Sequence, residues 1–312
     1  MILEPLSNIN LYGLESYFKE CASLYDENRL PNKILFSGKK GLGKSTLAYH
    51  IINYVCSQNE NNKYDKINNV INVENKSFKL IQNSTHPNFY LIDIFEGKKT
   101  IDIEQIRTMI TYTNKSNFNE NPRFVLIDNI ESLNKNSINA LLKIVEEPKK
   151  NLFFILIHNN ETKILPTLIS RCLTFKINLN FKEVVLVANK ILNKNIFEVL
   201  NENLVNHYSS PGQIFRLINY ANDKKIDLKN QSLDKILINL IDNNSYKKNT
   251  YVKELLIDLI QLFFVNEYKI SNNKDNFIKT YHHFMSKIYS TNKFNLDEES
   301  LFLEFKTKLL NG

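Results

Sequence analysis

Cysteine and long apolar runs are scarce in this sequence. The 312 residues include only three cysteines, Cys21, Cys56 and Cys172, too few for a disulfide framework and too far apart for a CxxC metal pair. No run of roughly 18 apolar residues is present, so no membrane-spanning helix is expected. The first residues lack the cationic and apolar stretches of a secretory signal. These absences predict a reduced, soluble, cytoplasmic protein.

Positive charge exceeds negative charge, but only weakly indicates nucleic-acid binding. The net charge is +7, from 40 Lys and Arg against 33 Asp and Glu. The chain also has 47 Asn and abundant Lys and Ile, spread over every segment. This composition is typical of drift toward A+T-rich codons, which favours a basic protein whatever it binds.

The first half of the chain alternates strand-like and helix-like segments. Ile34 to Phe36 is a short apolar run, followed by a glycine-rich turn and by apolar residues at helical spacing up to Val55. Further apolar runs occupy 124–127 and 152–157, and a helix is expected between them over 137–147, ending at Pro148. Buried strands alternating with helices predict an α/β fold with a parallel sheet, whose ligand site lies at the carboxyl ends of the strands.

From about residue 181 only helical patterns remain. The segment from Leu255 to Val265 is apolar nearly all round, which predicts a core or interface helix. The Asn- and Lys-rich segment Ser57–Lys79 is expected to be a loosely ordered insert. Helices are expected over 182–192, 196–205, 211–220, 233–241, 251–265, 276–289 and 298–310.

The glycine-rich turn has the spacing of a P-loop, Gly-x4-Gly-Lys-Ser. Glycines at these positions let successive backbone N–H groups approach phosphate oxygens closely. Lys44 would reach the β- and γ-phosphates, while Ser45 and Asp128, which ends the second apolar strand, would hold Mg²⁺. The predicted nucleotide-binding residues are Gly38, Lys39, Lys40, Gly41, Leu42, Gly43, Lys44, Ser45 and Thr46.

The residue after Asp128 is unsuited to hydrolysis. Many P-loop ATPases carry a Glu there to orient the attacking water, and this chain has Asn129, which cannot accept a proton. Glu131, Glu146 and Glu147 lie elsewhere, although Glu131 could substitute. The sequence therefore predicts nucleotide binding, by ATP or ADP with Mg²⁺, and weak or absent hydrolysis.

Four further blocks follow one another along the chain. Arg29-Leu30-Pro31 leads into the P-loop, and residues 85–90 read Thr-His-Pro-Asn-Phe-Tyr. Residues 139–148 read Asn-Ala-Leu-Leu-Lys-Ile-Val-Glu-Glu-Pro, and 165–172 end in Ser-Arg-Cys. Together these blocks resemble the bacterial clamp-loader AAA+ subunits of DNA polymerase III, and among them the delta-prime family.

The resemblance implies an AAA+ architecture of three domains: an α/β nucleotide-binding domain at 1–178, a helical lid at 179–224 and an all-α collar at 225–312. It also implies a stator that joins gamma/tau motor subunits and the delta subunit in a hetero-oligomer. That complex loads the sliding clamp onto primer–template DNA, which such a subunit would touch only through phosphates. Relatives with zinc carry four cysteines after the P-loop helix, whereas this segment has only Cys56, so no zinc site is expected.

The resemblance also implies roles for single residues. Arg171 of the Ser-Arg-Cys motif would be an arginine finger, acting in trans on the ATP of a neighbouring motor subunit. Asn159 is the candidate for the polar sensor at the end of the third strand, with His158 as its competitor. The lid arginine of hydrolysing members has no clear counterpart, because Gln213 stands near that place and Arg216 is one turn further on.

Two other functions stay open from the sequence. One is a self-sufficient gamma/tau-like ATPase with Glu131 as its base, and Asn129 counts against it. The other is a nucleotide-gated DNA-binding AAA+ factor, and the Ser-Arg-Cys motif, which serves a neighbour's ATP, counts against that.

Overall fold

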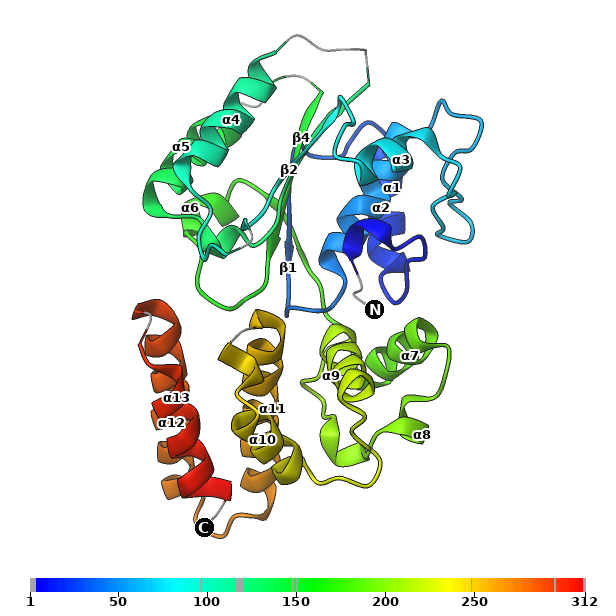
Figure 1. Cartoon of the computed structure of the whole chain (residues 1–312). Helices are drawn as coiled ribbons and strands as arrows, with labels where there is room; N and C mark the ends of the chain where they lie inside the picture. The colour runs from blue at the N-terminus through cyan, green and yellow to red at the C-terminus, as the bar shows by residue number, and fades with distance from the viewer. Residues whose placement is uncertain are drawn as a thin grey trace. The chain divides into compact units, whose positions relative to one another are not determined.

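The computed structural model describes residues 4–95, 97–115, 121–146, 149, 151–247, 249–294 and 296–310 (Figure 1). It divides the chain into two compact units, Met1–Glu183 and Val184–Gly312, which are described separately below. The expected three domains, 1–178, 179–224 and 225–312, stay a prediction.

A five-stranded parallel sheet forms the centre of the first unit. Its order is β2-β3-β4-β1-β5, and every neighbouring pair is parallel. The α/β parallel-sheet prediction is therefore confirmed, and the three predicted strands are β1, β3 and β4. The strands are β1 (Lys33–Ser37), β2 (Phe89–Ile92), β3 (Arg123–Ile127), β4 (Leu152–His158) and β5 (Leu173–Lys176).

Helices cover both faces of this sheet, which explains why β3 and β4 are buried along their whole length. One face carries α4, α5 and α6, and the other carries α1, α2 and α3 (Figure 1). Side chains such as Leu35, Val125 and Phe154 point to the first face, where they share one apolar core with Met109 and Leu141. The helices are α1 (Glu15–Asp26), α2 (Lys44–Cys56), α3 (Lys76–Gln82), α4 (Ile103–Asn114), α5 (Lys135–Glu146) and α6 (Pro166–Ile169).

Helix α5 begins at Lys135, slightly before the expected start. Its predicted end at Glu147 and Pro148 lies outside the described residues. Single 3-10 turns occur at Pro5–Ser7 and Ile130–Ser132 in this unit.

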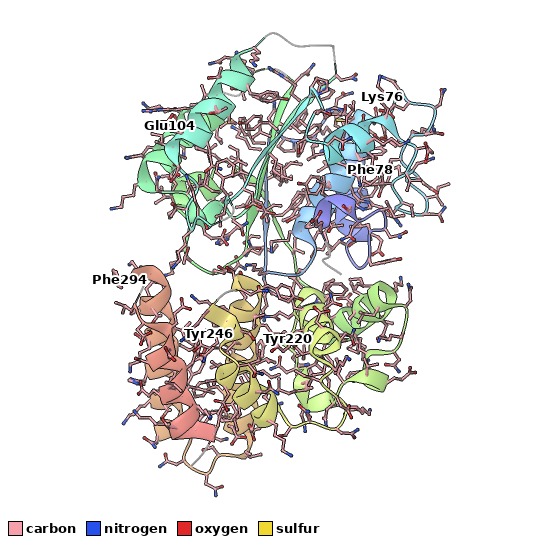
Figure 2. The ribbon with its side chains drawn as sticks, viewed as in Figure 1. Lys76, Phe78, Glu104, Tyr220, Tyr246 and Phe294 are labelled. Atoms are coloured by element: carbon pink, nitrogen blue, oxygen red, sulfur yellow. The ribbon has the colours of Figure 1, made fainter. Side chains whose placement is uncertain are left out.

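The segment Ser57–Lys79 has a defined fold, so the prediction of a loosely ordered insert is wrong. Asn75, which precedes α3, is fully buried. Its side-chain oxygen accepts from the Phe78 N–H at 2.7 Å, and its amide donates to the Asn62 carbonyl at 3.0 Å. Glu60 accepts from the backbone N–H groups that begin α3. Phe78, on α3, is buried (Figure 2). Asn-rich composition indicated disorder, but Asn side chains also satisfy turns and helix starts, as here.

The second unit is all-helical, as expected. The segment predicted as one helix over 196–205 is instead two short pieces, because Leu200 is extended and Asn201 caps a separate 3-10 turn, Glu202–Leu204. Its other helices agree with the predicted segments to within a few residues. They are α7 (Phe181–Leu192), α8 (Ile196–Val199), α9 (Pro211–Lys224), α10 (Leu233–Asp242), α11 (Thr250–Ile270), α12 (Lys274–Phe294) and α13 (Glu298–Phe305), with a 3-10 turn at Ser245–Lys247 and a π-helical turn at Lys306–Leu310.

Helix α11 is the core helix of this unit. Phe264 packs against Phe284 of α12 and Phe305 of α13, with ring centroids 6.1 and 5.9 Å apart. Tyr246 stacks edge-on against Phe302 at 4.7 Å (Figure 2). Most apolar residues of α11 are therefore buried in packing contacts within the second unit. Among the described residues, no helix has the length and apolarity needed to cross a bilayer.

Candidate functional site

The P-loop lies where the sheet order places it, between the carboxyl end of β1 and the first turn of α2. Gly38 donates its N–H to the His158 carbonyl of the neighbouring strand at 3.1 Å. A Cβ at Gly38 would lie 2.3 Å from the Ile177 carbonyl oxygen, so no larger residue fits. Gly43 precedes α2 with a φ of 89°, in the left-handed region that favours glycine. The loop thus opens directly onto the N-terminus of a 13-residue helix, a site suited to anions.

Lys44 is folded into the loop, where it is 3% exposed. Its ammonium group donates to the carbonyl oxygens of Gly38 at 2.7 Å and Lys39 at 2.8 Å. Burial lowers the pKa of Lys44 to about 8, against the opposing effect of nearby carboxylates, chiefly those of Asp128 and Glu131. An ammonium held this way lacks a full counter-charge, which phosphate oxygens would supply.

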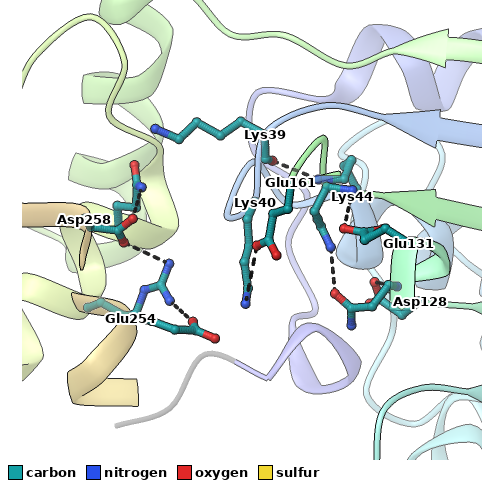
Figure 3. A network of polar contacts seen from close by, with 12 residues as sticks. Lys39, Lys40, Lys44, Asp128, Glu131, Glu161, Glu254 and Asp258 are labelled. Atoms are coloured by element: carbon teal, nitrogen blue, oxygen red, sulfur yellow. Dashed lines mark hydrogen bonds and ion pairs between the residues drawn. The ribbon is translucent and has the colours of Figure 1, made fainter. Parts of the chain in front are cut away.

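Ser45 and Asp128, the two predicted Mg²⁺ ligands, lie in contact at the sheet edge. The Ser45 hydroxyl donates to Asp128 Oδ2 at 2.5 Å, and the Asn129 N–H donates to Asp128 Oδ1 at 2.8 Å. Figure 3 shows Asp128 beside Glu131. Burial raises the pKa of Asp128 to about 6, and the negative charge of Asp93 adds to the rise, while the Ser45 bond opposes it. A hydroxyl and a half-buried carboxylate form a donor set that fits Mg²⁺.

The other predicted loop residues occupy different positions. Leu42 and Thr46 are buried, and Thr46 Oγ1 accepts from the Asn8 amide at 3.5 Å. Lys40 faces outward, with its Nζ 4.0 Å from Glu161 (Figure 3). Gly41 has a φ of 85°, and Lys39 contributes its carbonyl to Lys44.

A chain of side-chain amides runs along the same edge, from β2 to β4. Asn129 donates from Nδ2 to Asp93 Oδ1 at 2.7 Å, and its own Oδ1 accepts from Asn159 Nδ2 at 2.7 Å. The Asn159 N–H donates to Glu131 Oε1 at 3.0 Å, while the Glu131 Oε2 atom is buried without a hydrogen-bond partner. The structure therefore brings Asn129, Glu131 and Asn159 together beside the Lys44–Ser45–Asp128 group.

His158 has a different position from Asn159. Its Nε2 donates to the Thr162 carbonyl at 2.8 Å and its Nδ1 lies 3.2 Å from Ser37 Oγ. Both ring nitrogens are thus engaged by the strand end and its loop. Of the two candidates, Asn159 is the one that contacts Asn129 and Glu131.

Arg171 lies away from this group, between α6 and β5. Its guanidinium donates to the Thr167 carbonyl at 2.8 Å and pairs with Glu146 of α5 at 3.0 Å. The Arg171 side chain is 37% exposed. Leu165, Ile169 and other apolar side chains on this segment are also exposed.

Arg216, on α9 in the second unit, has a strongly enclosed guanidinium. It pairs with Glu254 of α11, and its Nη2 lies 3.4 Å from Asp258 Oδ2 (Figure 3). Gln213, in the first turn of the same helix, donates to Asp258 Oδ1 at 2.7 Å and closes a capping box with Ser210. Both lid candidates are thus bonded to α11.

The sequence interpretation missed Asp93. Phe89–Ile92 is an apolar run ending in Asp, the same pattern that identified Asp128 after β3, and that repetition was the available signal. The Asp93 backbone is held in turn, because its carbonyl accepts from Gln105 of α4 at 2.8 Å.

The comparisons with known proteins bear on this geometry. A family model described as "DNA polymerase III, delta subunit" matches residues 13–180, which is over half of the chain. The chain belongs to this clamp-loader AAA+ family. The family match includes the P-loop, Asp128 and the Ser-Arg-Cys segment.

Several curated relatives resemble this clamp-loader chain. DNA polymerase III subunit delta' of Pseudomonas aeruginosa is 32% identical over 99 residues, covering 32% of this chain and 30% of the relative. Subunit delta' of Buchnera aphidicola subsp. Schizaphis graminum is 26% identical over 82% of this chain and 78% of its own length. Subunit gamma of Buchnera aphidicola subsp. Baizongia pistaciae is 26% identical over 90% and 82%. Identity is thus equal toward delta' and gamma in these two longer matches.

A solved Thermotoga maritima protein, related to the DNA polymerase III gamma subunit, covers 93% of this chain with a TM-score of 0.49 and 17% identity. The chain covers 95% of that structure.

Proposed function

We propose that this clamp-loader family member is a delta-prime-like stator. It binds ATP or ADP with Mg²⁺ at its P-loop, hydrolyses it poorly, and supplies Arg171 to the ATP of a neighbouring motor subunit. Its partners are the gamma/tau and delta subunits, and through them the sliding clamp and primer–template DNA. Any DNA contact is to phosphates, without a base code.

The observation that carries this proposal is the bonding of Asn129. A hydrolysing site needs a carboxylate beside Asp128 that is free to orient water. Here an amide stands in that place, and both of its ends are committed, to Asp93 and to Asn159. The phosphate cradle itself is complete, so binding without efficient turnover fits these groups.

The nucleotide would be held by the residues already described. The backbone of the loop and the start of α2 would bind phosphate oxygens, and Lys44 would exchange its two carbonyl acceptors for them. Mg²⁺, held by Ser45 and Asp128, would neutralise charge on the phosphates.

Arg171 is suited to a role in trans. Its contacts, Thr167 and Glu146, are not part of the P-loop, and an exposed ion pair of this kind stabilises the fold by only about 0–1 kcal/mol. A guanidinium so weakly held can move to the phosphates of a partner's nucleotide with little cost to its own fold. There it would stabilise the charge of the transition state.

The test is the DNA-dependent ATPase of a reconstituted complex that carries Arg171→Ala in this chain alone. We expect assembly to persist, and the motor site that Arg171 completes to lose about 10³-fold or more in rate. Arg107→Ala is the matched control, because Arg107 is also exposed and paired with one carboxylate, Glu104. Equal rates for the two variants would disprove the role in trans.

One observation favours a second function, a self-sufficient motor subunit. Glu131 lies at the same edge and has a buried carboxylate oxygen without a hydrogen-bond partner, as a water-orienting base would. This alternative requires turnover by the isolated chain and its loss in Glu131→Gln. Absence of turnover by the isolated chain would reject it.

A further inference from the structure

The amide chain along the sheet edge has a direction, and Asp93 determines it. An Asn side chain can present either its carbonyl or its NH₂ group to a neighbour, and a half-turn exchanges the two. A carboxylate only accepts hydrogen bonds. Asn129 must therefore turn its NH₂ group toward Asp93, which leaves its carbonyl facing Asn159. Asn159 must then donate a hydrogen bond from its own NH₂ group to that carbonyl.

The two ends of this chain are fixed by the backbone. Asp93 Oδ1 also accepts from the Ile94 N–H at 2.7 Å, so the carboxylate cannot rotate freely. At the other end the Asn159 N–H is bonded to Glu131, and the residue before it gives its carbonyl to Gly38 of the P-loop. Asn159 is thus adjacent to the loop and 8% exposed, and the orientation of its side-chain amide depends on Asp93, two hydrogen bonds away.

We propose that Asp93 is a positioning residue: acting through Asn129, it fixes the orientation of the Asn159 amide and so lets the site distinguish a nucleoside triphosphate from a diphosphate. This inference rests on the proposed nucleotide binding. The Asn159 NH₂ group has a second N–H besides the one bonded to Asn129, and this N–H would attract the terminal phosphate of a triphosphate, whereas a carbonyl oxygen in its place would repel it. A diphosphate lacks that phosphate and is indifferent to the orientation.

The direct test is Asp93→Asn, with affinities for ATPγS and ADP measured by calorimetry in Mg²⁺. An amide at 93 can donate or accept, so the chain can run in both directions and Asn159 loses its fixed orientation. We expect ATPγS affinity to fall by about 3–10-fold, the weakening of one hydrogen bond to a charged oxygen, with ADP affinity within about twofold. Asp234→Asn, an exposed Asp→Asn change in the first turn of α10, is the matched control and should change neither affinity.

The sign of the change separates this role from simple electrostatics. Removing a negative charge near the loop should strengthen the binding of any anionic nucleotide, the triphosphate most. A rise in affinity for both ligands in Asp93→Asn would therefore overturn the proposal.

A rescue variant sharpens the test. In Asp93→Asn with Asn129→Asp, the carboxylate stands in the middle of the chain and accepts from both neighbours. The Asn159 NH₂ group is again forced toward position 129, so the preference for ATPγS should return to near the wild-type value. A double variant as weak as Asp93→Asn would show that orientation of Asn159 is not what Asp93 controls.

A readout without nucleotide keeps this inference separate from the proposed function. The side-chain NH₂ resonances of Asn159 can be assigned in Asn-labelled protein by comparison with Asn159→Ala. In the wild type they should form one set of signals, with slow exchange of the NH₂ protons with water. In Asp93→Asn they should be doubled or fast-exchanging, and in the double variant single again. Unchanged resonances in Asp93→Asn would overturn the proposal. If the wild-type chain bound neither nucleotide, both the proposed nucleotide binding and the proposed discrimination would be wrong. The spectra would still show whether Asp93 fixes the orientation of the Asn159 amide.

Discussion

The two charged regions of the first unit differ in how far their charge is withdrawn from solvent. At the P-loop edge, Lys44 is buried and Asp128 half-buried, with pKa values displaced to about 8 and about 6. At the Arg171 surface, the guanidinium is 37% exposed and shares one carboxylate, Glu146. Withdrawing charge from solvent lowers the stability of the first region, which suits the nucleotide site proposed there, whereas the exposed ion pair of the second region contributes little to stability in either direction.

The largest expected effect comes from Lys44→Met. Phosphate affinity should fall by about 100-fold or more, because the only buried ammonium of the loop is lost. The unliganded protein should nevertheless gain about 1 kcal/mol in unfolding free energy at pH 7. The displaced pKa corresponds to a penalty of about 3 kcal/mol, against which two hydrogen bonds of about 1 kcal/mol each are lost.

The sign of the Lys44 effect depends on pH. The folded pKa lies below the unfolded one, so the charge penalty is fully present below pH 8 and disappears as pH rises from about 8 to 10.5. Urea unfolding of both proteins at pH 7 and pH 10 measures the difference. If Lys44→Met were less stable than the wild type at pH 7, the P-loop edge would not carry the charge penalty that distinguishes it from the Arg171 surface. Arg171→Met, the counterpart at the other region, should change stability by less than about 0.5 kcal/mol.

A moderate effect is expected from protons that compete with Mg²⁺ at Asp128. Its folded pKa is raised to about 6, so the carboxyl becomes neutral as pH falls through 6 toward 4. Magnesium-dependent ADP affinity should then fall about tenfold per pH unit below 6, as one proton displaces one ligand charge. Calorimetry from pH 5 to 8 measures this affinity. The control is Asp128→Asn, because protonation of the ADP phosphate affects it in the same way as the wild type, and the variant should lose the magnesium-dependent part of the slope. Parallel profiles for the two proteins would show that Asp128 does not meet the ion.

The smallest effect is expected at the Arg171 surface. Glu146→Gln should change the unfolding free energy by less than about 0.5 kcal/mol, since the ion pair is exposed and Arg171 keeps its Thr167 bond. The ATPase of the reconstituted complex should be unchanged or slightly raised. A loss above about 2 kcal/mol, or loss of ATPase, would mean that this pair is structural, and the contrast between the regions would disappear.

Sequence patterns predicted the parts of the fold and site that are local in the chain. The P-loop needs only its glycine spacing and the flanking apolar runs, and Asp128 follows directly from the strand before it. β5 and β2 were not identified, because β5 alternates polar and apolar residues over four positions and β2 is equally short. Periodicity carries little information over so few residues.

Partners from distant segments could not be predicted. The orientation of the Asn129 side chain depends on its hydrogen bonds to Asp93 and Asn159. Only the parallel register of β2, β3 and β4 brings these three residues to one edge of the sheet. Arg216 depends likewise on α11, whose register against α9 no sequence spacing determines. The predicted disorder of Ser57–Lys79 failed for the same reason, since composition does not reveal that Asn53 of α2 donates to Asn75.

That segment has a consequence for how the protein matures. Its turns are held by Asn75, Glu60 and the buried pair His50–Tyr64, whose ring nitrogen and hydroxyl lie 2.8 Å apart. All of these groups belong to the chain itself and are present as soon as it is synthesised. The described residues contain no cluster of His, Cys, Asp and Glu that could hold a metal ion, so the turns of this segment are closed by hydrogen bonds that need only the chain's own groups to come together.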